Sequence, residues 1–441
     1  MINNMNRKPN QHTAVPVWED FSLISESISQ DNLYLKSALI GRIGLIYLSC
    51  GVGSWRIQEA INQVSNKLGI SCVMSFGIRT IEYSCFQQGM CCTNVLSIPN
   101  VGVNTTKLAE IQRFVNNFEQ YLSRGFKSVN SELDLIEKIG KIYPIPITCL
   151  FSGVACGSFT FLIGGGIVEI ICALLAATSG YLMKIILEKY SITITLNIIL
   201  TIFTSCISYD VILNIFIFLF GANMNSQAGY IGAILFIVPG FPFITSCLDI
   251  SKLYIRSGVE RLTYSLLIII LAAISASIVA TLLQFTPEPF VFHGINPWEY
   301  LILRLFASAL GVYGFSVLFN SKPNIALYAA IIGSISNTIR LELIDLGTTQ
   351  VLSAIFGSLI AGILASLINK HHTTTRISLT IPSVVIMVPG SYIYRAIFLL
   401  SNNHLDAGGY WITQSIFILL SLPIGLLIAR IITDKNFRHC S

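Results

Sequence analysis

Among the charged side chains in long apolar stretches of this sequence, four have types and positions that suit the chemistry of transport. Glu169, Asp210 and Asp249 carry carboxylates, and Arg395 carries a guanidinium. An ionisable residue inside a membrane segment is energetically expensive and is therefore a functional candidate by default. A carboxylate held away from water can exchange protons near neutral pH, and a guanidinium can bind a substrate carboxylate through two hydrogen bonds. We therefore predict three proton carriers and, in Arg395, a clamp for the substrate.

Each of these assignments has a simpler structural alternative. Glu169 could lie in a loop outside the membrane, Asp210 could mark a helix boundary, and Asp249 could cap a helix at the inner interface. A weaker polar cluster stands in another apolar segment, where Asn337 lies close to Arg340.

The tripeptide Val-Pro-Gly ends two apolar runs and places Pro239 and Gly240 in one, Pro389 and Gly390 in the other. Proline removes a backbone donor and glycine frees φ, so each copy should break a helix. Paired breaks in two halves of a membrane protein point to a transport site. Helix N-termini at the breaks would suit a substrate carboxylate, and exposed carbonyls or a carboxylate its ammonium. The alternative is that each Pro-Gly only kinks its helix.

Membrane-spanning helices must position these residues. The mean hydropathy of +0.71 and the 11% share of charged residues lie far from the averages of soluble proteins. A span needs about 20 mostly apolar residues, and this length predicts ten spans, with the Val-Pro-Gly breaks in the fourth and the ninth. The predicted spans are 147–163, 166–187, 194–220, 228–248, 262–284, 300–319, 324–341, 350–369, 380–400 and 409–432.

The loops between these spans differ in charge according to side. With the N-terminus in the cytoplasm, the inner loops and the C-terminal end hold 11 Lys and Arg residues. The outer loops, 221–227, 285–299, 342–349 and 401–408, hold none. Loops rich in Lys and Arg stay on the cytoplasmic side. The sequence therefore predicts a multi-pass protein of the cell (inner) membrane with both termini cytoplasmic.

The two halves of the membrane region resemble each other. Phe159-Thr160-Phe161-Leu162 corresponds to Phe315-Ser316-Val317-Leu318 at an offset close to that of the two breaks. Each half has five predicted spans, and five is odd, so the second half should be inverted relative to the first. We predict an inverted repeat of residues 146–285 and 286–441, with the site near the midplane of the membrane.

A polar region precedes the spans. Residues 1–30 are predicted to form a disordered tail, and 31–145 a soluble cytoplasmic α+β domain. Its expected elements are helices at 32–50 and 55–68, two to four short strands within 71–98, and helices at 105–122 and 131–140. Ser54 is the expected N-cap of the second helix, and Gly69 its C-terminal stop.

This domain shows no enzyme signature. It has no GxSxG or HExxH motif, and the only histidine before residue 293 is His12. The 11 cysteines form no CxxC pair with histidines at ligand spacing, so no metal or other cofactor is expected. No basic cluster accompanies the net charge of +5, so no nucleic-acid partner is expected either.

Several motifs together resemble the threonine/serine exporter family, called ThrE type. They are GVGSWRIQEAINQVSNKLGI, VGVNTTKLAEI, FLIGGGIVE and the two Val-Pro-Gly tripeptides, and the resemblance covers roughly residues 35–432. The two halves of these exporters can be one chain or two partner proteins, and here one chain carries both. The resemblance implies export of threonine and serine driven by the proton motive force.

These patterns favour a secondary exporter whose partners are a small amino acid, protons and the lipid bilayer. The sequence does not decide whether the protein forms a homo-oligomer. Two alternatives come from other classes: a membrane-anchored enzyme or sensor whose cytoplasmic domain carries the activity, and a passive channel for small solutes. An anchor would need neither an inverted repeat nor paired breaks, so the sequence favours transport and predicts that the protein is not an enzyme.

Overall fold

The computed structural model describes residues 32–98, 101–220, 227–283, 296–371 and 375–434. The predicted tail at 1–30 lies outside these residues, as do most of the predicted outer loops 221–227 and 285–299. The chain divides into two compact units. The first holds the described residues up to Lys141 together with Thr245–Leu262, and the second holds those of Ile142–Ile244 and from Thr263 onward.

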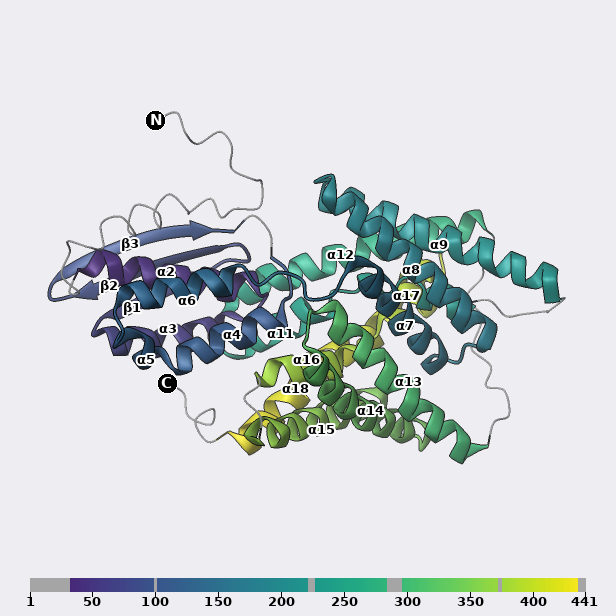
Figure 1. The fold of residues 1–441 in the computed structure, drawn as a ribbon. Coiled ribbons are helices and arrows are strands. Elements are labelled where there is room, and N and C mark those ends of the chain that lie inside the picture. The colour runs from purple at the N-terminus through teal and green to yellow at the C-terminus, as the bar shows by residue number, and fades with distance from the viewer. Residues whose placement is uncertain (1–31, 99–100, 221–226, 284–295, 372–374, 435–441) are drawn as a thin grey trace. The chain divides into compact units, whose positions relative to one another are not determined.

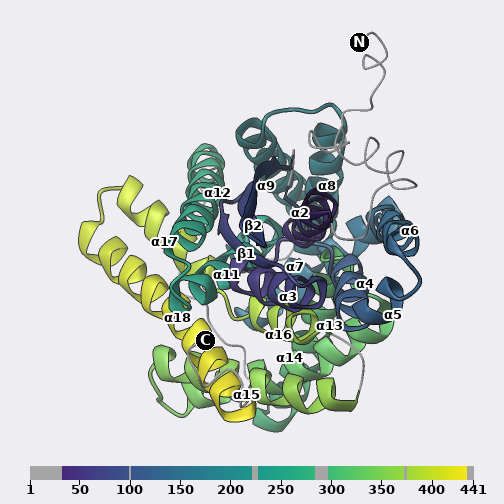
Figure 2. The same ribbon diagram turned by 90° about the vertical axis from the view of Figure 1, so that its left-hand side faces the viewer.

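The first unit is an α+β domain built around a three-stranded antiparallel sheet (Figures 1 and 2). Alternate residues of the central strand, Ile81, Tyr83 and Cys85, are buried, as expected of a sheet with one covered face. Tyr83 donates a hydrogen bond of 2.9 Å to the Ser37 carbonyl and so ties the sheet to the first helix. The elements are α2 (Leu33–Ser49), α3 (Ser54–Leu68), β1 (Ser71–Phe76), β2 (Thr80–Gln87), β3 (Met90–Ser97), α4 (Thr105–Asn116), α5 (Phe118–Leu122) and α6 (Phe126–Glu137).

Local sequence signals located most of these elements. Gly69 stops α3 in the left-handed conformation with φ of 67°, as its position predicted. The predicted helix at 105–122 is interrupted at Asn117, which separates α4 from α5. Ser54 is the first residue of α3 rather than its N-cap, which is Gly53. That prediction was wrong because a distant carboxylate, described below, accepts from the first N–H groups of this helix.

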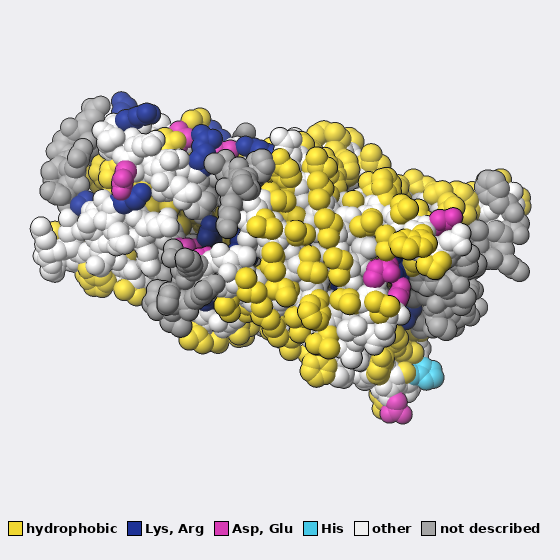
Figure 3. Space-filling view, turned by 90° about the horizontal axis from the view of Figure 1, so that it is seen from below, with side chains coloured by type: hydrophobic (Ala, Val, Ile, Leu, Met, Phe, Trp, Pro, Cys, Tyr) yellow, Lys and Arg dark blue, Asp and Glu magenta, His cyan; other side chains and the backbone are white. Residues whose placement is uncertain are grey.

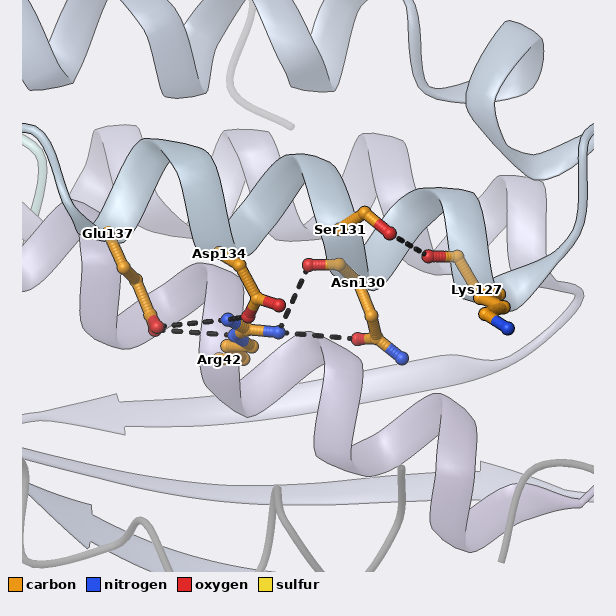
Figure 4. A network of polar contacts seen from close by, with 6 residues as sticks. All are labelled: Arg42, Lys127, Asn130, Ser131, Asp134 and Glu137. Atoms are coloured by element: carbon orange, nitrogen blue, oxygen red, sulfur yellow. Dashed lines mark hydrogen bonds and ion pairs between the residues drawn. The ribbon is translucent and has the colours of Figure 1, made fainter. Parts of the chain in front are cut away.

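A buried arginine fastens α2 to α6 (Figure 4). Arg42 is 5% exposed and pairs with Asp134 and Glu137, while its guanidinium also donates to Asn130. Burial opposes the charge of Arg42, but Glu137 and Asp134 outweigh it and raise its pKa above the ordinary value. Its carboxylate partners are partly exposed, so the arrangement buries the charge of Arg42 and pairs it without burying a second full charge.

The second unit is helical. Its helices are α7 (Ile145–Leu162), α8 (Ile167–Lys189), α9 (Ile194–Phe220), α10 (Gln227–Gly232), the 3₁₀ turn η1 (Leu235–Ile237), α11 (Gly240–Ser251), α12 (Ile255–Leu282), α13 (Pro297–Leu318), α14 (Pro323–Asp345), α15 (Gln350–His371), α16 (Arg376–Val385), α17 (Gly390–Ser401) and α18 (Leu405–Thr433). Thr245–Ser251 of α11 and the first residues of α12 belong to the first unit. Hydrophobic side chains cover most of the face of the helical unit seen in Figure 3.

Among the described residues, eight helices are long and apolar enough to cross a membrane, or up to ten if each of two bent pairs is one span. The bent pairs are Ala228–Ile237 with Gly240–Ser251, at 62°, and Arg376–Val385 with Gly390–Leu400, at 42°. They correspond to the predicted fourth and ninth spans. Each Val-Pro-Gly tripeptide therefore interrupts a helix, as predicted from proline and glycine at these positions.

Candidate functional site

The two interrupted spans have the same local backbone structure. The Gly240 N–H donates a hydrogen bond of 2.8 Å to the Val238 carbonyl, and the Gly390 N–H donates one of 2.8 Å to the Val388 carbonyl. An i→i+2 bond of this kind closes an inverse γ-turn, and Pro389, with φ of −78° and ψ of 54°, has its backbone geometry. A new helix begins at the glycine in both copies. The repeated tripeptide thus encodes a repeated structural device.

The two breaks also pack against each other. A β-carbon added at Gly390 would lie 2.6 Å from Cδ2 of Leu235 and 3.3 Å from the side chain of Val238, in the first broken span. A β-carbon added at Gly240 would lie 3.0 Å from the side chain of Val385, in the second. Glycine at both positions lets the broken spans pack closely, because a side chain at either one would press on the other span and force it to shift. The predicted site residues Pro239, Gly240, Pro389 and Gly390 therefore lie together.

Three tyrosines form a cluster that includes one residue from each broken span, and sequence reasoning missed them. The rings of Tyr230 and Tyr394, one from each broken span, have centroids 6.0 Å apart. The ring of Tyr209 in α9 lies 6.1 Å from that of Tyr230. The hydroxyl of Tyr230 donates a hydrogen bond of 2.6 Å to the Ala276 carbonyl in α12. A signal was present, since tyrosine inside an apolar segment carries a polar group that must find a partner.

Arg395 lies on another side of α17 from Tyr394. Its guanidinium carbon is 4.9 Å from the centre of the Trp411 ring in α18, in a cation–π arrangement. The Tyr392 ring meets the same indole edge-on at 5.0 Å. Arg395 thus belongs to the second broken span, and it is positioned through an aromatic contact with the last helix.

Glu169 lies in the first turn of α8, where its side chain is 7% exposed. Its carboxylate accepts a hydrogen bond of 2.7 Å from the N–H of Gly166, the residue that precedes α8. Glu169 also lies within electrostatic reach of Tyr209. Tyr209 in turn contacts Tyr230, whose ring contacts that of Tyr394, one helical turn beyond Gly390.

Asp210 lies well inside α9, which continues to Phe220, so it does not mark a helix boundary. Its side chain is partly buried and can bond with that of Asn214, one turn further along the helix. Asp210 follows Tyr209 directly and is within electrostatic reach of Tyr230. The proton-carrying roles of Glu169 and Asp210 remain predictions, and both residues adjoin the tyrosine cluster.

Asp249 is placed differently, in the first unit, where it closes the N-terminus of α3. Its carboxylate accepts from the N–H groups of Ser54 at 3.0 Å and Trp55 at 3.4 Å. Oδ2 lies 3.9 Å from Nε of Arg261, and Asp249 and Arg261 are 0% and 3% exposed. A helix N-terminus attracts negative charge, so Asp249 acts as a cap supplied by a segment 195 residues away.

We expect Asp249→Ala to destabilise the first unit by about 3–5 kcal/mol, because it leaves the Arg261 charge buried without this partner. Loss of the cap adds to this cost. Hydrogen exchange of the backbone amides at the start of α3 would measure the effect. Asp434→Ala is the matched control, since Asp434 forms an i,i+4 pair with Arg430 and is 34% exposed. Unchanged amide protection at Ser54 and Trp55 would contradict this account.

No group of three or more His, Cys, Asp or Glu side chains that could hold a metal ion occurs within the described ranges.

Arg340, which sequence reasoning ranked below Arg395, lies in α14 and is 8% exposed. Its NH1 donates a hydrogen bond of 3.2 Å to Oδ1 of Asn337. Nδ2 of Asn337 in turn donates a hydrogen bond of 2.9 Å to the Ser308 hydroxyl in α13. The polar cluster predicted around Arg340 is therefore a hydrogen-bonded chain that links two helices.

Comparison with known proteins gives two matches to family models and two curated relatives. Residues 38–283 match a model described as "Putative threonine/serine exporter", and residues 304–432 match one described as "Threonine/Serine exporter, ThrE". The "Probable succinate transporter subunit YjjP" of Escherichia coli (strain K12) is 25% identical over 219 residues, which are 49% of this chain and 83% of that protein. The protein of the same name from Klebsiella aerogenes is 24% identical over 218 residues, 49% of this chain and 82% of its own. No solved structure matches the chain.

Proposed function

The chain belongs to the threonine/serine exporter family, and on that premise we propose that it exports threonine and serine, driven by the proton motive force. It carries the matches to both family models on one polypeptide. The observation that carries the proposal is the packing of two γ-turn breaks against each other. Interrupted helices that meet inside a bundle form the substrate sites of many secondary transporters.

The proposed site holds the substrate amino acid between the two breaks. Helices α11 and α17 begin there, and the positive ends of their dipoles favour the substrate carboxylate. The Pro239 and Pro389 carbonyls accept from the Phe243 and Ile393 N–H groups, so the second lone pair of each is proposed to accept from the ammonium group. Arg395 is proposed to supply charge for the carboxylate.

Protons are proposed to move through Glu169 and Asp210, which adjoin the tyrosine cluster beside the breaks. Tyrosine hydroxyls can both donate and accept hydrogen bonds, so they are suited to connect a carboxylate with the substrate. Asp249 is the third proposed carrier. Because it also closes the N-terminus of α3, the transport rate of any Asp249 variant has to be read together with its stability.

We further propose ten spans in an inverted repeat of 146–285 and 286–441, with the domain of 31–145 and both termini in the cytoplasm. Leu346 and Tyr190 test this topology, because they are 82% and 74% exposed at the ends of α14 and α8. In a cysteine-free background, a membrane-impermeant maleimide should label Leu346→Cys from outside intact cells. Tyr190→Cys should react only after permeabilisation. The reverse pattern would exclude the proposed topology and the inverted repeat with it.

Dicarboxylate transport is a second candidate function. The curated relatives are named as succinate transporter subunits, and a second arginine, Arg340, lies within electrostatic reach of Tyr392, as Arg395 does. A solute with two carboxylates could bind one arginine with each of them.

Counterflow with the purified protein in liposomes decides between these substrates. Liposomes loaded with unlabelled threonine should take up labelled threonine and serine, and succinate in excess should not compete. Uptake of labelled succinate into succinate-loaded liposomes, with no threonine counterflow, would replace the proposal by the second candidate.

A further inference from the structure

Arg340 differs from the other buried arginines of the described chain in its partners. Arg42 pairs with Asp134 and Glu137, Arg261 lies beside Asp249, and Arg304 pairs with Glu342 at 2.7 Å and Asp345 at 2.5 Å. These three and Arg340 are the arginines below 9% exposure within the described residues. No described carboxylate lies within ion-pair distance of Arg340, although Arg304 finds two at the end of the same helix.

An unpaired guanidinium in a helix bundle carries a high energetic cost. Arginine stays protonated in proteins, so Arg340 cannot avoid the cost by losing its charge. A buried charge is normally paired or binds an ion. Arg340 donates one side-chain hydrogen bond, to Asn337, and its Nε has no hydrogen-bond partner among the described residues. A bound anion would offset this cost.

The surroundings of Arg340 connect it to the second break. A β-carbon added at Gly357 in α15 would lie 3.0 Å from Cβ of Arg340 and 3.2 Å from Sδ of Met387. Met387 immediately precedes Val388-Pro389-Gly390. Glycine at 357 thus lets the stem of Arg340 and the residue before the break approach the same point. On the other side of the break, Tyr392 lies within electrostatic reach of the guanidinium.

We propose that Arg340, held by Asn337 and Ser308, binds a carboxylate group of the transported solute at the second break. The inference rests on the proposed transport function and deepens it. Asn337 fixes one nitrogen of the guanidinium and leaves the remaining edge for the planar, two-oxygen geometry of a carboxylate. The same chemistry fits the one carboxylate of threonine or one of the two carboxylates of succinate, and the test separates the two.

The test is ligand binding to the purified full-length protein, followed as the shift of its thermal unfolding midpoint. The probes are L-threonine, L-threoninol, which lacks the carboxylate, and succinate. Wild type should be stabilised by threonine and not by threoninol. Arg340→Gln should weaken this binding about 10- to 100-fold, the size of one charge-assisted interaction, and Arg340→Lys should fall between. Stabilisation by succinate alone would assign the carboxylate to the dicarboxylate.

The unfolding of Arg340→Gln without ligand and the behaviour of a control variant test the inference further. Without ligand, Arg340→Gln should unfold no earlier than wild type, because it removes a buried charge that has no carboxylate partner among the described residues. The matched control Arg304→Gln breaks two ion pairs, so it should unfold earlier and yet bind the ligand with unchanged affinity. If Arg340→Gln binds as tightly as wild type, the inference is overturned and the transport function stands. If neither carboxylate stabilises wild type, both fail.

Discussion

Gly390→Leu and Gly240→Leu should each abolish threonine transport while leaving the protein in the membrane. A branched side chain at Gly390 would collide with Leu235, since a β-carbon alone would lie 2.6 Å from Cδ2. At Gly240 it would collide with Val385, at 3.0 Å. The two breaks would be forced apart, and a displacement near 1 Å at a site can cost about 100-fold in rate. Efflux from preloaded proteoliposomes would measure the loss.

Alanine variants and a compensating second substitution test the same contacts separately. Gly390→Ala should impair transport more than Gly240→Ala, because the clearance at Gly390 is smaller. Leu235→Ala removes the side chain that collides and should restore transport to Gly390→Ala. Gly409→Leu is the matched control, since no atom lies within 4 Å of a β-carbon at this helical glycine. If the leucine variants at 240 and 390 transport like Gly409→Leu, the breaks are not part of the transport site.

Glu169→Gln and Asp210→Asn should remove proton coupling and leave downhill exchange intact. Both amides keep the shape of the carboxylate, and the amide oxygen of the first variant could still accept from the Gly166 N–H, which donates 2.7 Å to Glu169. Neither amide can carry a proton at neutral pH. Threonine counterflow should therefore persist near the wild-type rate. Uptake driven by an imposed pH gradient should fall about 100-fold or more, the usual scale for a lost proton-transfer group.

Glu188→Gln is the control on the same helix. Glu188 lies in the last turn of α8 near Lys184, and its side chain is 48% exposed, so its charge is solvated. Gradient-driven uptake should be unchanged in this variant. If Glu169→Gln and Asp210→Asn both accumulate threonine as well as Glu188→Gln does, the proton carriers have to be sought elsewhere.

The sequence predicted the features that depend on local chemistry. Ten apolar segments matched the observed helices, and the interruptions fell at Pro239-Gly240 and Pro389-Gly390, because a missing N–H donor and a missing β-carbon act within one helical turn. Two to four short strands were expected within 71–98 from β-branched and aromatic composition and from breaks at Gly77 and Gly89. Three strands are observed, and Gly89 has φ of 81°.

Features that depend on tertiary contacts were not predictable from local patterns. Ser54 resembled an N-cap, but the capping group is the carboxylate of Asp249, which no local rule can connect to α3. The fit of Leu235 against Gly390 joins residues 155 positions apart. Arg340 ranked below Arg395 because a single sequence does not show that the other buried arginines have carboxylate partners and that this one has none within the described residues.

The central claim is that this chain couples threonine movement to protons, and one measurement tests it most directly. Proteoliposomes containing the purified wild-type chain would be given an inside-acidic pH gradient and labelled threonine at equal concentration on both sides. We expect threonine to accumulate above equilibrium, as protons leave in exchange, and the accumulation to collapse on addition of a protonophore. Equilibration without accumulation, at a rate the protonophore leaves unchanged, would contradict the account and identify a passive pathway.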